Sequence, residues 1–305
     1  MKRTSTVFLV FSMLCILHAA PAQAQPQQGS PWSFTFDGGG AHRSESDFKD
    51  GPGAVSVDRW FLGAGVNYGW SPRSSVGLSV GTGRSNYDFN DLTSFGAGEP
   101  WGTIEDSRLS FSARFGVGEK GVAFIIPSIR MNGEKGASNS DSRTYGLFGA
   151  VAWRIDENLT IGPGFGVFSR LEGSTTFFPI LAIDWTFAER WNLSTGKGLA
   201  SSRGPGLALT YKLNENWDLG IAGRYEDQEF RLAETGIAPG GVGRDQSFPL
   251  IFKADLKPNK KMNFSVFAGV AFGGNLRIKD AADNLVEESD YELAPLFGGS
   301  FEFRF

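Results

Sequence analysis

The chain has 305 residues, of which 29 are lysine or arginine and 33 are aspartate or glutamate, so its formal net charge at pH 7 is -4. A nucleic-acid-binding protein needs a basic surface, and this charge balance argues against that class. The single cysteine, Cys15, excludes an internal disulfide and a metal site with several thiolate ligands. After the first 24 residues, no apolar run is long enough to cross a bilayer as a helix.

Residues 1–24 have the three parts of a secretory signal peptide. The chain starts with two basic residues, continues with an apolar run at 7–17, and has Ala22 and Ala24 at the positions that a signal peptidase reads. The apolar run is too short, and too closely followed by the cleavage pattern, to be a membrane span. We predict that residues 1–24 are removed.

Lipidation of the chain is not expected. Leu14 precedes Cys15 at a position where a lipoprotein signal has a small residue. A polar lead-in at 25–31 follows the predicted cleavage site, and no linker divides the sequence after it. We therefore predict a single domain at 32–305.

Segments of alternating apolar and polar residues recur through this domain, and a period of two is typical of strands whose faces differ. The connections between the segments alternate in length, as in an up-and-down barrel. Short connections rich in turn-forming residues lie at 71–74, 118–121, 156–158, 188–190, 214–216 and 258–261. The others lie near 44–53, 90–103, 136–142, 172–174, 200–204, 233–244 and 280–288.

This division leaves about fourteen strands, an even number that places both chain ends on the same side of a closed barrel. Without a helical span, a membrane-crossing chain must form a closed barrel, because unpaired backbone groups are costly in lipid. We predict an all-β fold, a transmembrane antiparallel up-and-down β-barrel. Twelve strands is the alternative count, because segments 191–199 and 205–213 are short and the first strand is weak.

The two faces of a strand are clearest at 262–279. One parity is free of polar side chains from Met262 to Ile278, and the other includes Asn263, Ser265 and Arg277. We predict that the first parity faces lipid along the whole segment. A soluble sandwich would alternate too, but its connections would have no reason to alternate in length. Five tryptophans close to short connections predict an aromatic girdle at that end: Trp70, Trp153, Trp185, Trp191 and Trp217.

The last segment, 291–305, has an unusually aromatic face. Its apolar parity consists of Leu293, Phe297, Phe301, Phe303 and Phe305. The segment resembles the closing strand of bacterial outer-membrane β-barrels, in which a terminal Phe also serves as the assembly signal. The resemblance implies an outer-membrane location, contact with lipid, and insertion by the barrel-assembly machinery through the Phe305 strand. A soluble β-protein with an apolar last strand is the alternative interpretation.

Further motifs lie at 230–232, 238–243, 268–270, 273–278 and 290–295. With them the C-terminal third resembles an uncharacterised family of outer-membrane β-barrel proteins, a domain of unknown function. Asn275 and Glu292 depart from the pattern of that family. The resemblance implies the barrel fold and its location, and it implies no catalytic residue.

Charged side chains on the inward parity are the candidate lumen-lining residues. They are Arg114, Arg154, Asp184, Lys212, Asp218, Arg224, Glu226, Lys253 and Asp255. Lipid would not tolerate these charges, so the lumen is predicted to be polar. Two interpretations stay open, a water-filled pathway for small solutes and a lumen that is closed by ion pairs. Barrels of about eight strands are filled by side chains and those of about sixteen hold channels, so an intermediate size does not decide between them.

Three phenylalanines, Phe148, Phe168 and Phe178, fall on the inward parity of three consecutive strands at similar heights. They form a possible constriction or an apolar contact for a solute. Alternatively, a bulge or a slipped register turns some of them outward, and Pro163 and Pro179 in the same strands are compatible with such an irregularity.

Catalytic groups are sparse. His42 and Ser44 have a spacing that resembles the His-x-Ser of outer-membrane phospholipases, but the sequence places no orienting Asn or Asp beside them. An outer-membrane esterase is thus a remote alternative. The acidic loops at 45–50 and 280–290 lack the spacing of an EF-hand, and we expect no metal and no cofactor.

We expect a monomeric protein that is not an enzyme. The leading functional hypothesis is a passive channel or transporter for small solutes. The second hypothesis is a non-conducting barrel that acts through its extracellular loops as an adhesin, receptor or structural anchor.

Overall fold

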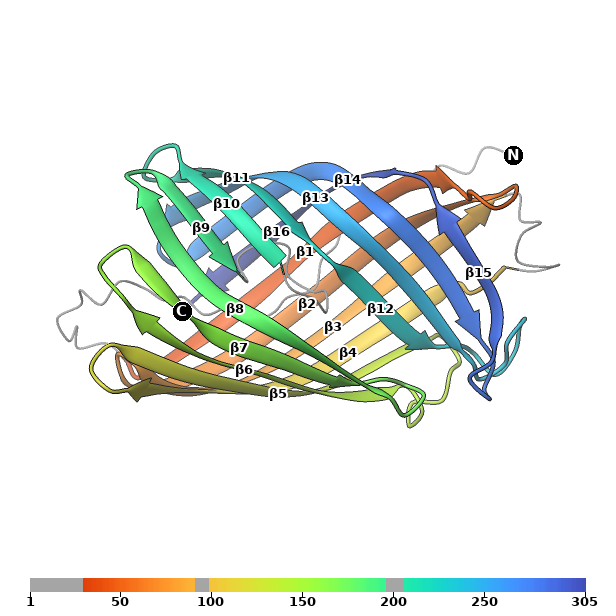
Figure 1. Ribbon diagram of the computed structural model, residues 1–305, viewed down its shortest axis with the longest axis horizontal. Helices are drawn as coiled ribbons and strands as arrows, with labels where there is room; N and C mark the ends of the chain where they lie inside the picture. The colour runs from red at the N-terminus through yellow and green to blue at the C-terminus, as the bar shows by residue number, and fades with distance from the viewer. Residues whose placement is uncertain (1–29, 91–98, 196–205) are drawn as a thin grey trace.

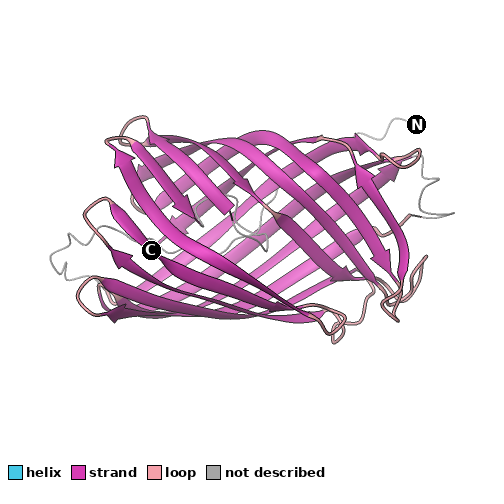
Figure 2. Ribbon diagram, viewed as in Figure 1, coloured by secondary structure: helices cyan, strands magenta, loops and turns pink. Residues whose placement is uncertain are grey.

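The computed structural model describes residues 30–90, 99–195 and 206–305, and the regular structure of these residues is all β-strand (Figure 2). The predicted signal peptide, the lead-in up to residue 29 and the predicted loop at 200–204 lie outside the described residues. The described part of the chain holds no helix long and apolar enough to cross a membrane.

The strands form one continuous sheet (Figure 1). They are β1 (Trp32–Asp47), β2 (Ala54–Ser71), β3 (Ser74–Asn90), β4 (Thr103–Val117), β5 (Gly121–Glu134), β6 (Arg143–Arg154), β7 (Leu159–Ser169), β8 (Thr175–Ala188), β9 (Trp191–Thr195), β10 (Gly206–Lys212), β11 (Trp217–Arg224), β12 (Glu226–Arg231), β13 (Val242–Asn259), β14 (Met262–Lys279), β15 (Leu285–Tyr291) and β16 (Ala294–Arg304).

The sheet closes into a barrel because β13 pairs with β14 and β1 pairs with β16. β11 and β12 are successive parts of one long strand, since both pair with β13, and β15 and β16 both pair with β14 in the same way. The result is a closed barrel of 14 antiparallel strands, which confirms the predicted fold and the larger of the two predicted strand counts.

One end of the barrel, here called the turn end, carries the short connections and the C-terminus. Asp156 and Asn214 shape two of these turns, because each side-chain oxygen accepts hydrogen bonds from backbone N–H groups two and three residues further on, at 2.7–3.0 Å. The backbones of Phe34 and Phe305 bond to each other at the same end. The opposite end, the loop end, carries the longer connections (Figure 1).

The outer surface of the barrel is apolar. Val80, Leu181, Phe252 and Val266 are 53–64% exposed, while the residues next to them in the chain are less exposed and belong to the inward face. The five predicted girdle tryptophans are 38–50% exposed beside the turns, as expected for indoles at a membrane interface.

The predicted lipid face of β14 is wrong beyond residue 272. Gly273 has a φ of 61°, and the pairing of β14 with β13 shifts register at this point. A β-bulge inserts one extra residue and thereby exchanges the faces of the strand beyond it. Leu276 and Ile278 are therefore fully buried inside the barrel, and Arg277 lies on the outside.

An aromatic core fills the barrel at the loop end. Trp101 is 2% exposed, and its ring meets Phe230 edge-on at 4.9 Å and Tyr87 at 5.5 Å between centroids. The other buried members are Phe48, Val55, Val57, Phe89, Ile104, Leu232, Ala238, Ala271, Leu276, Ile278, Tyr291 and Ala294. Buried side chains in mutual contact leave little room for water, so we expect this core to obstruct the loop end of the described barrel.

Strand β12, which contributes Phe230 to this core, narrows the barrel at the loop end. Arg231 at its end pairs in parallel with Gly133 of β5, and the side-chain amide of Asn132 donates to the backbone oxygen of Glu229 at 2.7 Å. The wall at the loop end therefore passes directly from β5 to β12. Strands β6 to β10 belong only to the wider part of the barrel, and β9 and β10 are described up to Thr195 and from Gly206, on either side of residues 196–205.

Candidate functional site

A buried ionic cluster lies directly beneath the aromatic core. The carboxylate of Asp245, 2% exposed, accepts hydrogen bonds from Arg43 at 3.1 Å, from Arg59 at 3.0 Å, and from the hydroxyls of Tyr87 and Tyr291 at 2.9 Å each. Two guanidinium groups and two phenols thus surround one carboxylate. Such a set stabilises a buried charge only as long as every member is present.

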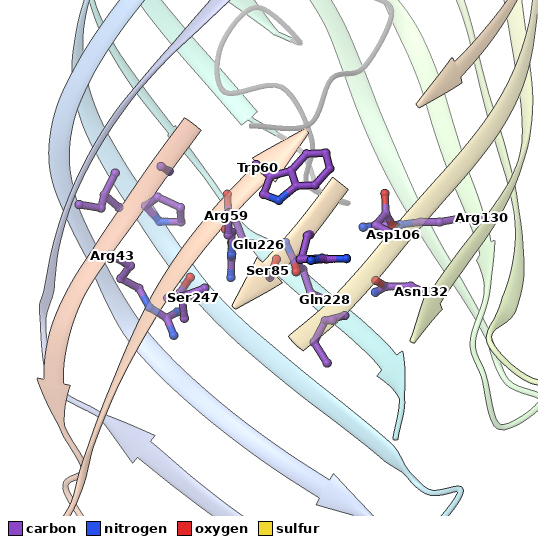
Figure 3. A pocket seen from close by; sticks show the side chains of 17 residues that line it. Arg43, Arg59, Trp60, Ser85, Asp106, Arg130, Asn132, Glu226, Gln228 and Ser247 are labelled. Carbon is purple, nitrogen blue, oxygen red and sulfur yellow. Dashed lines mark hydrogen bonds and ion pairs between the residues drawn. The ribbon is translucent and has the colours of Figure 1, made fainter. Parts of the chain in front are cut away.

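Further polar side chains line a small cavity of about 60 Å³ beside this cluster. Figure 3 shows that they come from β1 to β5, β12 and β13, and it labels Trp60, Ser85, Asp106, Arg130, Asn132, Glu226, Gln228 and Ser247 with the two arginines. Glu226 pairs with Arg59 at 3.1 Å, and Asp106 pairs with Arg130. This space holds at most a few water molecules, so it is no passage for a solute.

Most of the predicted lumen-lining charges are found in pairs. Lys253 meets Asp255 at 2.6 Å, and the amide of Asn192 donates to Asp184 at 2.6 Å. Arg224 approaches Glu226 at 3.4 Å, and Asp218 pairs with Lys257. The remaining three candidates lie on the lumen parity nearer the turn end, with Lys212 exposed and Arg114 and Arg154 half-buried. Such pairs are expected in a lumen that is closed by ion pairs, which is one of the two interpretations that the sequence left open.

A second, much larger cavity of about 790 Å³ lies in the wider part of the barrel. The side chains of Phe148, Phe168 and Phe178 line it together with Ile126 and Ile180. A polar strip on β4, β5 and β6 also belongs to the lining, with Arg108, Ser110, Ser128, Arg130 and Thr144. The cavity is thus mainly apolar, with a few groups that can form hydrogen bonds.

The three phenylalanines occupy the inward face without a slipped register. Phe168 pairs with Gly146, and both Phe148 and Phe178 pair with Gly166. A Cβ atom at Gly166 would come within 2.3 Å of the Phe178 ring, so this ring lies flat over the glycine of the neighbouring strand. The Phe168 and Phe178 rings are stacked at 5.6 Å. Because the rings lie flat against the inner surface of the barrel, they extend less far into the lumen than the sequence analysis assumed. A constriction at this point stays a prediction.

The same cavity also touches residues of the outward face. On β8 it reaches Leu181 and Ile183, and across the β9–β10 hairpin it reaches Leu250. Leu181 and Leu250 are 53% and 41% exposed on the outer surface. Further outward residues in its lining are Leu193, Leu207, Phe248 and Phe272. The described lining thus includes residues of both faces of the sheet, beside the connection 196–205, which lies outside the described residues.

Within the described residues, β8 pairs with β9 at Asp184, Trp185 and Ala188, and the backbone of Ile183 bonds to the hydroxyl of Thr195, the last described residue of β9. Residues 196–205, which join β9 to β10, lie outside the described residues.

Ion pairs join the connection between β7 and β8 to β12. Arg170, in that connection, contacts Glu229 at 3.2 Å and Asp227 at 3.3 Å on β12. Arg231 of β12 contacts Glu172 of the same connection at 2.5 Å. These contacts tie the tip of the β7–β8 hairpin to β12.

His42 has the orienting acid that the sequence did not reveal. Its Nδ1 lies 2.8 Å from Asp58, and its ring lies 5.3 Å from the ring of Phe297 on the outer face. Ser44 lies in the register shift of β1 between Arg43 and Ser46, and no hydrogen bond joins it to His42 within the described residues. The described chain also holds no cluster of His, Cys, Asp or Glu that fits a metal ion.

The closed sheet, the apolar outer belt and the tryptophan girdle define a class of protein. The chain is a bacterial outer-membrane β-barrel, which confirms the predicted location. We expect its turn end to face the periplasm and its loop end to face outward, as is typical of bacterial barrels. Assembly through the Phe305 strand and a monomeric state stay predictions.

No family model matches the chain, and no curated protein matches it, so the resemblance of the C-terminal third to an uncharacterised family stays a prediction. Solved structures with a similar fold include an outer membrane channel from Pseudomonas putida F1, with 9% identity over 92% of this chain and 97% of that chain and a TM-score of 0.49. A Pseudomonas aeruginosa FadL homologue has 13% identity over 90% and 88% of the two chains and a TM-score of 0.43. The KdgM porin has 9% identity over 89% and 99% and a TM-score of 0.35.

Proposed function

We propose that this barrel is a passive channel for small solutes and that the large cavity is its binding and passage site. The observation that carries the proposal is the cavity, about 790 Å³ of mainly apolar lining with a polar strip. Sites for small molecules typically have about 300–1,000 Å³ and the same composition. A solute would cross the outer membrane down its concentration gradient, with weak contacts that permit both entry and release.

Filling the cavity tests this proposal. Ser128 lines the cavity beside Gly146, and Ser128→Trp would occupy much of it. We expect cells that carry the protein to take up the apolar dye 1-N-phenylnaphthylamine faster than cells with an empty vector. We expect Ser128→Trp to lower this additional uptake about tenfold. A tenfold change corresponds to a loss of about 1.4 kcal/mol in the free energy of solute binding.

Ser79→Trp is the matched control, because Ser79 lies on the inward face of β3 outside the cavity lining. Folding of both variants is checked by their faster migration on a detergent gel before boiling. Equal dye uptake with and without the wild-type barrel would contradict the proposal.

The second candidate is a non-conducting barrel that acts through its extracellular loops. The aromatic core at the loop end supports it, because we expect this core to obstruct the path along the barrel axis. The two candidates differ in dye uptake, which only a channel would raise.

The core at the loop end leads to a prediction for ion conductance. The wild-type protein in a planar bilayer is expected to conduct potassium chloride poorly. Replacing Trp101 and Phe230 by Ala removes two buried rings from the core and is expected to raise the single-channel conductance, at a cost of about 3–5 kcal/mol of stability for each ring. High conductance of the wild type would show that the core does not seal the barrel.

A further inference from the structure

The charged side chains that line the large cavity are all cationic. Among the described residues of its lining, three are arginines, Arg108, Arg130 and Arg224, and none is an aspartate or a glutamate. Asp106 pairs with Arg130, but this carboxylate belongs to the lining of the small cavity (Figure 3). Glu226, which approaches Arg224 at 3.4 Å, lines the small cavity as well. The charge that a solute meets in the large cavity is therefore positive, and such a cavity attracts anions.

Two of the three arginines lie directly opposite each other. Arg108 of β4 and Arg130 of β5 form a cross-strand pair on the inward face. The Cβ atoms of such a pair are about 5 Å apart, and like charges at this spacing repel each other. An anion between the two guanidinium groups would offset this repulsion and accept hydrogen bonds from both of them.

Hydroxyl groups extend the polar strip on both sides of the arginine pair. Ser110 and Ser128 are the next opposed pair of inward residues on β4 and β5, and Thr144 of β6 lies opposite Arg130. All three hydroxyl residues line the cavity. Because a hydroxyl can donate a hydrogen bond to an anionic oxygen, the strip can hold the oxygens of an acidic group from several directions.

The apolar part of the lining begins on the same strands. Ile126 of β5 lies opposite Phe148 and four residues before Arg130, hence about 13 Å from the arginine pair along the strand. The rings of Phe168 and Phe178, stacked at 5.6 Å, continue this apolar surface. Aromatic faces suit a planar apolar body. A solute that contacts both parts needs an acidic group at one end and one or two rings at the other.

We infer that the large cavity binds small amphipathic anions, in which a carboxylate or sulfonate group is attached to one or two aromatic rings. The acidic group lies between Arg108 and Arg130, and the rings lie over Ile126 and the phenylalanines. The inference rests on the proposed channel function and adds to it a substrate class and the residues that select it. The residues of this site all belong to the continuously described range 99–195.

Two probes with the same ring system test the inference. Naphthalene-2-sulfonate is an anion, and naphthalene-2-sulfonamide is its neutral counterpart. Their binding to the purified barrel in an uncharged detergent is measured by isothermal titration calorimetry, with a titration into the same detergent without protein subtracted. We expect the wild type to bind the sulfonate more tightly than the sulfonamide.

Two variants change the charge of the site in different ways. Arg108→Gln removes one guanidinium group, and Ser128→Asp places a carboxylate beside the arginine pair, where it takes the place of the solute's acidic group. Each is expected to weaken binding of the sulfonate about tenfold and to leave binding of the sulfonamide within about twofold.

Each variant has a matched control. Ser128→Asn has nearly the same shape as Ser128→Asp without its charge. Arg154→Gln removes an arginine from the lumen parity nearer the turn end, outside the lining of the large cavity. Both controls are expected to bind the sulfonate as the wild type does. Faster migration before boiling on a detergent gel shows that each variant is folded.

The outcomes separate the inference from the channel proposal. Equal binding of the two probes by the wild type, or sulfonate binding that a folded Ser128→Asp variant leaves unchanged, would overturn the anion site, while dye uptake above the empty vector would leave the channel standing. Sulfonate binding that depends on Arg108 and Ser128 as expected, without any dye uptake, would support the site and overturn the channel.

Discussion

Asp245→Ala is expected to destabilise the barrel by about 3–5 kcal/mol, because it leaves the buried guanidinium groups of Arg43 and Arg59 without their shared carboxylate. The hydroxyls of Tyr87 and Tyr291 lose their acceptor in the same substitution. The measurement is the urea midpoint of unfolding in detergent micelles, followed by the loss of fast gel migration.

A surface pair provides the control for this substitution. Asp283 pairs with Lys279 at 2.6 Å, but its side chain is 50% exposed. Exposed pairs contribute about 0–1 kcal/mol, so Lys279→Ala is expected to be nearly neutral; Asp283 itself is kept, because its φ of 66° suits Asp better than Ala. If the two variants unfold at the same urea concentration, the Asp245 cluster does not hold the strands together as its geometry indicates.

Val80→Arg is expected to lower the free energy of unfolding by about 2–4 kcal/mol if this side chain lies near the middle of the bilayer. Val80 is 53% exposed on the lipid face of β3. The preceding residue, Ser79, points into the lumen between Gly65 and Ser110. Ser79→Arg is therefore expected to lower the free energy of unfolding much less. The reversible unfolding of both variants in lipid vesicles measures the difference.

Equal costs at the two positions would mean that both faces of β3 are buried in protein, which contradicts a membrane barrel. A comparison of Ala271 with Phe272 on β14 is less suitable, because Ala271 is 1% exposed within the packed interior. An arginine at that position would be too large for its surroundings whether or not the outer face meets lipid.

The large cavity was only partly predictable. The parity of Phe148, Phe168 and Phe178 placed these residues on the inward face, and the structure brings them to one cavity wall. The glycines beneath the rings explain why they lie flat, and this depends on which residue of the neighbouring strand stands opposite. Alternation identifies the face of a side chain, but it does not give the register.

The contact between β12 and β5 was not predictable. Arg231 pairs with Gly133, and the two strands are far apart in the sequence. A strand's length can be estimated from its own residues, but such a contact depends on how the whole sheet closes.

The all-β barrel, a count of about fourteen strands, the turns and the outer-membrane location could all be derived from the amino-acid sequence. Those properties follow from a period of two, from turn chemistry and from the aromatic last strand, which are local features. The contents of the barrel are visible only in the folded chain. Asp245 meets Arg43 and Tyr87 across 202 and 158 residues of sequence, and the bulge at Gly273 turns two more apolar side chains inward. Closure of the sheet brings such distant residues together, and no local pattern records which of them will meet.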